Sequence, residues 1–73
     1  MVKLYSKPGC GGCMATKRDL DRRKVKYETI DVSENEDALL YLKEKGFLRM
    51  PVVETPDEMW SGYDSEKIES LVA

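Results

Sequence analysis

Residues 2–13 read VKLYSKPGCGGC, and this stretch places a strand, a turn and the start of a helix next to one another. The apolar run at residues 2–6 is typical of a short strand, and the Pro-Gly pair that follows is typical of a turn. Residues 14–23 read MATKRDLDRR and favour a helix. Cys10 and Cys13 therefore lie where a strand has ended and a helix begins.

The rest of the chain continues the alternation of strands and helices. We expect a first helix over 11–24 and a strand over 25–32. A second helix over 34–45 is expected to begin with a capping box formed by Ser33 and Glu36. A hairpin of strands 52–54 and 59–61 and a last helix capped by Asp64 follow. Strands joined by a helical crossover are expected to be parallel, and hairpin strands antiparallel. The order β-α-β-α-β-β-α predicts an α/β fold, a four-stranded mixed sheet with helices on both faces, in a single domain spanning 1–73.

Composition narrows the classes of function. The net charge of -2 argues against a general nucleic-acid binder. No leader and no long apolar run is present, so we expect no export signal, no membrane span and a reducing cytoplasmic location. Residues 1–27 carry eight basic and two acidic groups, whereas residues 28–73 carry four basic and twelve acidic ones. The basic part is either a solvated helix face or a surface that attracts an acidic partner.

The pair of cysteines allows three interpretations. A structural disulfide between Cys10 and Cys13 would enclose only two residues, so it would remove little entropy from the unfolded chain. A zinc or iron–sulfur site needs about four ligands. With two Cys and no His, such a site would have to be shared by two chains. We favour the third interpretation, a redox-active dithiol that needs no metal and no cofactor besides its own disulfide.

The position of each cysteine on the helix predicts its role. The helix N-terminus and the nearby Lys3, Lys7 and Lys17 favour a thiolate. We expect Cys10 to be exposed at the helix tip and to attack a partner's disulfide. We expect Cys13 to be shielded one turn further on, from where it resolves the mixed disulfide.

Other residues have both a structural and a functional interpretation. Gly11 and Gly12 form a flexible turn or allow a partner backbone to approach. Pro51 either only begins a strand or also lies beside the thiols. Sequence spacing alone does not decide between these two interpretations. Trp60 is a core residue or a partly exposed docking aromatic.

Taken together, these features resemble the thioredoxin fold in its shortest, glutaredoxin-sized form. Within that group, residues 51–53 (PVV) and 60–63 (WSGY) are similar to the NrdH-redoxins, whose signature is WSGFRP. Residues 5–10 (YSKPGC) and 15–17 (ATK) are similar to the same family. The resemblance covers essentially the whole chain.

The resemblance implies a small dithiol electron carrier, a thiol–disulfide oxidoreductase that acts as a monomer on protein disulfides. It implies electron delivery to a class Ib ribonucleotide reductase and recycling by thioredoxin reductase. It also implies a cis Pro51 that faces the dithiol, and a Met50 backbone that pairs with a docked partner strand. The partner-binding residues are expected to be Lys7, Gly11, Gly12, Met50, Pro51, Trp60, Ser61, Gly62 and Asp64.

The chain departs from the NrdH pattern in two places. Asp-Ser at 64–65 replaces the usual Arg-Pro, and CGGC lacks the bulkier residues that the family typically has between its cysteines. Asp64 also places an acid where glutaredoxins often bind the amino group of glutathione, so a glutathione-coupled glutaredoxin is the alternative. Arg-Met at 49–50 in place of Thr-Val, and Trp-Ser at 60–61 in place of Gly-Gly, favour recycling by thioredoxin reductase.

Overall fold

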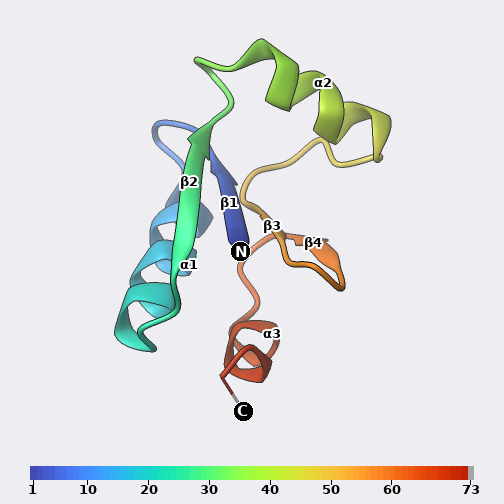
Figure 1. The fold of residues 1–73 in the computed structure, drawn as a ribbon. Helices are drawn as coiled ribbons and strands as arrows, with labels where there is room; N and C mark the ends of the chain where they lie inside the picture. Colours follow the sequence, from blue (N-terminus) through green and yellow to red (C-terminus); the bar gives the residue numbers. More distant parts are fainter. Residues whose placement is uncertain (73) are drawn as a thin grey trace.

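The computed structural model describes residues 1–72, which form three helices and four strands in the order β-α-β-α-β-β-α (Figure 1). The strands are β1 (Val2–Ser6), β2 (Tyr27–Asp31), β3 (Val52–Glu54) and β4 (Met59–Ser61). The helices are α1 (Gly11–Arg22), α2 (Glu36–Glu44) and α3 (Ser65–Ser70). The predicted order of elements is confirmed. Within residues 1–72, no helix has both the length and the apolar run needed to span a membrane.

All four strands form one mixed sheet, in the order β2-β1-β3-β4. The strand β1 is parallel to β2, which follows from the helical crossover between them. It is antiparallel to β3, and β3 is antiparallel to β4 across the hairpin. The sheet therefore has the predicted mixture of parallel and antiparallel pairs, and the cysteines lie directly beyond its central strand β1.

Helices cover both faces of the sheet, because neighbouring residues of a strand point to opposite faces. On one face, Leu4 and Val53 pack with buried side chains of α1, β4 and α3, which are Leu20, Trp60 and Ile68. On the other face, Tyr5 and Val52 pack with Val32 and with Leu42 of α2. The α1–α3 face and the α2 face each have their own small core.

The predicted capping box at the start of α2 is wrong. Asn35 is the N-cap residue, and its Oδ1 accepts the N–H of Ala38 at 3.0 Å. Ser33 instead donates its own N–H and its hydroxyl to Asp31 Oδ1, at 2.9 and 2.6 Å. The local turn at the end of β2 therefore uses the serine, and α2 begins two residues later than predicted.

Two other elements, α1 and β2, are shorter than predicted. The helix α1 ends at Arg22, and Lys24 has a left-handed φ of 59°. Val25 donates its N–H to the Leu20 carbonyl, so it belongs to this turn, and β2 begins only at Tyr27. By contrast, the predicted cap of the last helix is confirmed: Asp64 Oδ1 accepts the N–H of Lys67 at 3.1 Å.

Candidate dithiol site

Cys10 and Cys13 are joined in a disulfide at the start of α1, with Cα atoms 5.2 Å apart. Cys10 is the N-cap residue and has an extended backbone, and its Sγ accepts the N–H of Cys13 at 3.1 Å. A helix N-terminus has unpaired N–H groups and a partial positive charge. The geometry therefore stabilises negative charge on the Cys10 sulfur when the disulfide is open.

The predicted contrast in exposure between the two cysteines is wrong. Cys10 is 9% exposed and Cys13 is 5% exposed, so both are nearly covered. The cover over Cys10 comes from a distant segment of the chain, since its Sγ lies 3.6 Å from the carbonyl oxygen of Met50. A partner can reach only the small uncovered part of Cys10.

Pro51 lies against the N-terminal end of α1. The Met50–Pro51 peptide bond is cis, as the resemblance implied, and Pro51 is buried. A Cβ added at Gly12 would lie 3.1 Å from Pro51 Cδ, whereas a Cβ added at Gly11 would meet nothing within 4 Å. Gly12 therefore permits the close contact between helix and proline, while Gly11 borders open space.

The structure places Trp60 in the core and not on a docking surface. It is 6% exposed and packs with Leu4, Leu20 and Ile68. Its partner in the β3–β4 pairing is Val53, whose side chain also points to the α1–α3 face. The expectation of a partly exposed docking aromatic is therefore wrong, because strand register directs this side chain inward.

Ser61 and Gly62 hold the segment that carries Pro51. The Ser61 hydroxyl donates to the Arg49 carbonyl at 2.9 Å, and the Gly62 N–H donates to the Pro51 carbonyl at 2.8 Å. Gly62 has a φ of +88°, a conformation that favours glycine. Both residues thus position the Pro51 segment against the dithiol.

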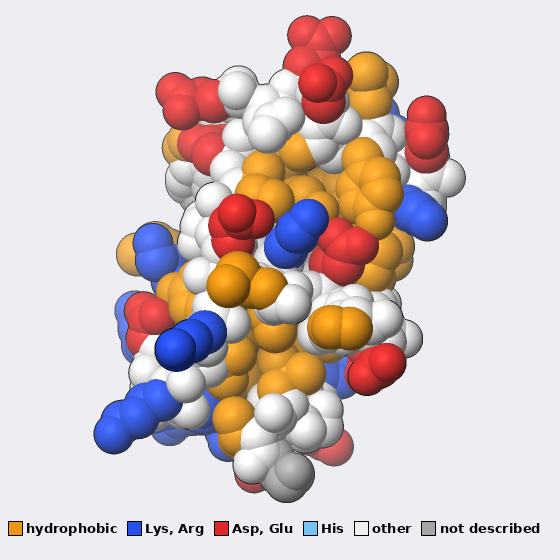
Figure 2. Space-filling view, in the orientation of Figure 1, with side chains coloured by type: hydrophobic (Ala, Val, Ile, Leu, Met, Phe, Trp, Pro, Cys, Tyr) orange, Lys and Arg blue, Asp and Glu red, His pale blue; other side chains and the backbone are white. Residues whose placement is uncertain are grey.

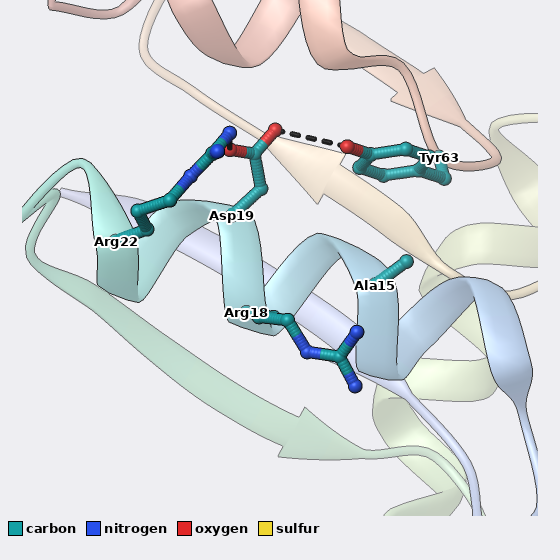
Figure 3. A pocket seen from close by; sticks show the side chains of 5 residues that line it. All are labelled: Ala15, Arg18, Asp19, Arg22 and Tyr63. Carbon is teal, nitrogen blue, oxygen red and sulfur yellow. Dashed lines mark hydrogen bonds and ion pairs between the residues drawn. The ribbon is translucent and has the colours of Figure 1, made fainter.

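A cluster around Asp19, a 3% exposed carboxylate on α1, was not predicted from the sequence. Arg22 donates to it at 2.6 Å and the hydroxyl of Tyr63 at 3.1 Å (Figure 3), and Arg23 donates to it at 3.0 Å. The Arg22 hydrogen bond lowers the pKa of Asp19 most, burial opposes it, and Arg23 and Tyr63 lower it further. The spacing of three and four residues between Asp19 and the two arginines indicates these ion pairs in the sequence. No sequence pattern indicates the contact from Tyr63.

Tyr63 stands where the NrdH signature has phenylalanine, so its hydroxyl is an addition. It follows Gly62 directly, and its bond to Asp19 connects the Pro51-holding segment to the middle of α1. The β4–α3 connection is therefore bonded directly to α1 through Tyr63, and it also holds the Pro51 segment that packs against Gly12.

Two of the three lysines predicted near the thiols are there. Lys7 and Lys17 line a hollow of about 200 Å³ together with Cys10 and Cys13. Lys3 is not, because β1 places it opposite Glu54 in the sheet. The basic character of the site comes from the turn before α1 and from α1 itself.

The comparisons with known proteins agree with this geometry. A family model for glutaredoxin matches residues 2–60. The chain is 34% identical over 70 residues to the glutaredoxin-like protein NrdH of Salmonella typhimurium, covering 96% of this chain and 86% of the relative. The match extends over nearly the whole chain.

Solved structures with the same arrangement are also found. The Escherichia coli glutaredoxin-like protein NrdH-redoxin, described as having a thioredoxin-like activity profile, superposes with a TM-score of 0.93 at 34% identity, covering 96% of this chain and 92% of that one. The thioredoxin-like protein BC3987 superposes with a TM-score of 0.88 at 28% identity, covering 97% and 99%.

Proposed function

We propose that this chain, which belongs to the glutaredoxin family and to its NrdH-redoxin branch, carries electrons as a dithiol to the disulfide of a larger protein. Members of this family are thiol–disulfide oxidoreductases. The observation that carries the proposal is the position of Cys10, whose sulfur accepts a helix N-terminal N–H and lies against the Met50 carbonyl.

The proposed reaction proceeds in two exchanges. The Cys10 thiolate attacks one sulfur of the partner's disulfide, and the other partner sulfur leaves as a thiolate that takes up a proton. Cys13 then loses its proton and attacks the Cys10 sulfur, which releases the second partner sulfur. Two electrons pass to the partner, which becomes a dithiol, and the Cys10–Cys13 disulfide re-forms. The short Cα separation of 5.2 Å lets the second exchange proceed without movement of the helix.

We propose ribonucleotide reductase as the electron acceptor and thioredoxin reductase as the donor, with the carrier acting as a cytoplasmic monomer that needs no bound cofactor. Support comes from 34% identity to NrdH over 96% of the chain. The Met50 backbone and the neighbouring Lys7 and Gly11 are proposed to contact the docked partner. Ser61 and Gly62 contribute indirectly, through their hydrogen bonds to Arg49 and Pro51.

The alternative donor is glutathione. The observation in its favour is Asp64, an acid at the position from which glutaredoxins often bind the glutathione amino group. In this structure Asp64 Oδ1 accepts the N–H of Lys67 and caps α3. The presence of an aspartate here is thus explained by the helix alone, and we favour the thioredoxin-reductase donor.

The test compares the two donors on the same disulfide substrate. One reaction contains thioredoxin reductase and NADPH, and the other contains glutathione, glutathione reductase and NADPH. We expect NADPH oxidation that depends on the protein in the first reaction and little in the second. Turnover with glutathione alone would overturn the proposed donor, and no turnover in either reaction would overturn the proposed function. A Cys10→Ser variant is the inactive control.

A further inference from the structure

Three adjoining hollows lie around the exposed side of α1. The first, of about 200 Å³, contains both cysteines and ends at Met14 and Lys17. The second, of about 320 Å³, is lined by the same two residues and extends to Arg18. The third, of about 200 Å³, shares Arg18 with the second and extends from Ala15 to Arg22 on the side of α1 that faces Tyr63 (Figure 3). Because each hollow shares lining residues with the next, we treat them as one surface, the α1 groove.

The α1 groove is basic. Lys7, Lys17, Arg18 and Arg22 line it. Lys17 and Arg18 are exposed and form no ion pair with any residue among 1–72. These two cations are available to a ligand.

The two carboxylates in the α1 groove are already engaged. Asp19 accepts hydrogen bonds from Arg22 and Tyr63, among others. Asp21 accepts the hydroxyl of Tyr27 at 2.7 Å. Arg22 and Arg23 offset the charge of Asp19, whereas the tyrosine hydroxyl leaves Asp21 charged. The four basic side chains still outnumber the two carboxylates, so the groove keeps a net positive charge.

Two exposed side chains with apolar surface line the groove: Met14, 63% exposed, lies where the first and second hollows meet, and Tyr63, 47% exposed, lines the third. The charge of the molecule is also segregated. Figure 2 shows Lys and Arg gathered at the lower left, over the C-terminal end of α1, and Asp and Glu at the top, over α2. A negatively charged segment is thus attracted to the α1 side and repelled from the α2 side.

We infer that the α1 groove binds an acidic, extended segment of the partner protein that adjoins the partner's reducible disulfide. This inference rests on the proposed function, because the first hollow must hold the partner's sulfur next to Cys10. From Cys13 to Arg22 the helix is about 14 Å long, which is the length of about four extended residues. Such a segment can place carboxylates beside Lys17 and Arg18 while its disulfide contacts Cys10.

The test uses two synthetic peptides, each closed by one intramolecular disulfide. In one peptide the disulfide is flanked on both sides by glutamates, and in the other by glutamines. The full-length protein is first reduced, freed of reductant and mixed with each peptide, and acid-quenched samples give the rate at which the peptide disulfide becomes a dithiol. We expect the glutamate peptide to react about tenfold faster at low salt, and the preference to shrink as ionic strength rises.

Charge-reversed variants locate the effect. We expect the double variant Lys17→Glu/Arg18→Glu to lose the preference, so that the ratio of the two rates falls to about one. Lys43→Glu, which reverses an exposed lysine on α2, is the matched control and should keep the ratio of the unmodified protein. Circular dichroism of each variant checks that the fold is intact, and the neutral pair Lys17→Gln/Arg18→Gln gives a milder change in the same direction.

The outcomes separate the two proposals. Reduction of both peptides at equal rates, or a preference that survives in Lys17→Glu/Arg18→Glu, would contradict the α1 groove and leave the proposed function standing. No reduction of either peptide would contradict the proposed function and, with it, the proposed binding by the α1 groove.

Discussion

The dithiol end of the molecule and the Glu54 cluster on the α2 face are held together in different ways. At the dithiol end, the donors are backbone N–H groups: the Cys13 N–H donates to Cys10 Sγ, and the Gly62 N–H donates to the Pro51 carbonyl. In the Glu54 cluster, side chains make them.

The Glu54 cluster consists of Tyr5, Tyr41 and Glu54. The two tyrosine hydroxyls donate to the two carboxylate oxygens of Glu54, at 2.7 and 2.6 Å. They join β1, α2 and β3 through one ionised group. Burial opposes ionisation of Glu54, but the hydrogen bonds from Tyr41 and Tyr5 and the charges of Lys3 and Lys45 outweigh it, and the pKa of Glu54 is lowered.

The two regions should therefore be sensitive to different kinds of change. Backbone contacts depend on the shape of the chain and do not titrate, so the dithiol end should respond to steric changes. The Glu54 cluster depends on a negative charge, so it should respond to pH. Substitutions at the first region should alter catalysis or packing, and substitutions at the second should alter stability and its pH dependence.

The largest effect is expected at the resolving cysteine. Cys13→Ser leaves Cys10 able to attack a partner but removes the thiol that releases it, so multiple turnover should fall by at least about 100-fold. Mass spectrometry after reaction with a disulfide substrate should find a mixed disulfide on Cys10. Cys10→Ser is the matched control, and a mixed disulfide trapped through Cys13 in that variant would reverse the roles assigned to the two sulfurs.

The next effect contrasts the two glycines of the dithiol end. Gly12→Val places a branched side chain against Pro51 Cδ, which an added Cβ already approaches to 3.1 Å, so we expect a loss of about 1–3 kcal/mol in the free energy of unfolding. Gly11→Val is the matched control, because a Cβ added at Gly11 meets nothing within 4 Å. Urea denaturation of both variants checks this, and equal losses would refute the steric role of Gly12.

The Glu54 cluster supplies the third prediction. Glu54→Gln removes the charge that accepts both tyrosine hydroxyls, so the free energy of unfolding at pH 7 should fall by about 1–2 kcal/mol. The lowered pKa means that ionised Glu54 stabilises the fold above its ordinary value of 4.5, and that this contribution is lost as pH falls through the folded-state pKa. Urea titrations at pH 7 and pH 3 should show the difference between the two proteins shrinking at the lower pH. A difference that is equal at both pH values would contradict the charge-based account.

The smallest effect is expected at Tyr63. Tyr63→Phe restores the residue of the NrdH signature and removes one hydrogen bond to Asp19, which Arg22 and Arg23 continue to hold. Because Tyr63 is 47% exposed, we expect a loss of only about 0.5–1 kcal/mol in the free energy of unfolding. Thermal unfolding measures it, and a loss as large as that of Glu54→Gln would mean that this bond matters more than its exposure indicates.

Local signals in the sequence determined much of this protein. The order of elements, the β3–β4 hairpin and the place of the cysteines at a helix start follow from patterns within a few residues of one another. The parallel β1–β2 pair follows from the helical crossover between those strands, whereas nothing local indicates the β1–β3 pair. The Asp64 cap was readable for the same reason, since a cap and the N–H that it accepts are three residues apart. The start of α2 has two possible N-cap residues, Ser33 and Asn35. The capping-box pattern favoured Ser33, but the structure uses Asn35.

Only the tertiary structure decided how the site is closed. The cover of Cys10 by Met50, the contact of Gly12 with Pro51 and the bond between Asp19 and Tyr63 join residues about 40 positions apart. The inward direction of Trp60 likewise depends on its register with Val53. Local propensity carries no information about such pairs, because they form only when the sheet and its two helical layers have packed together.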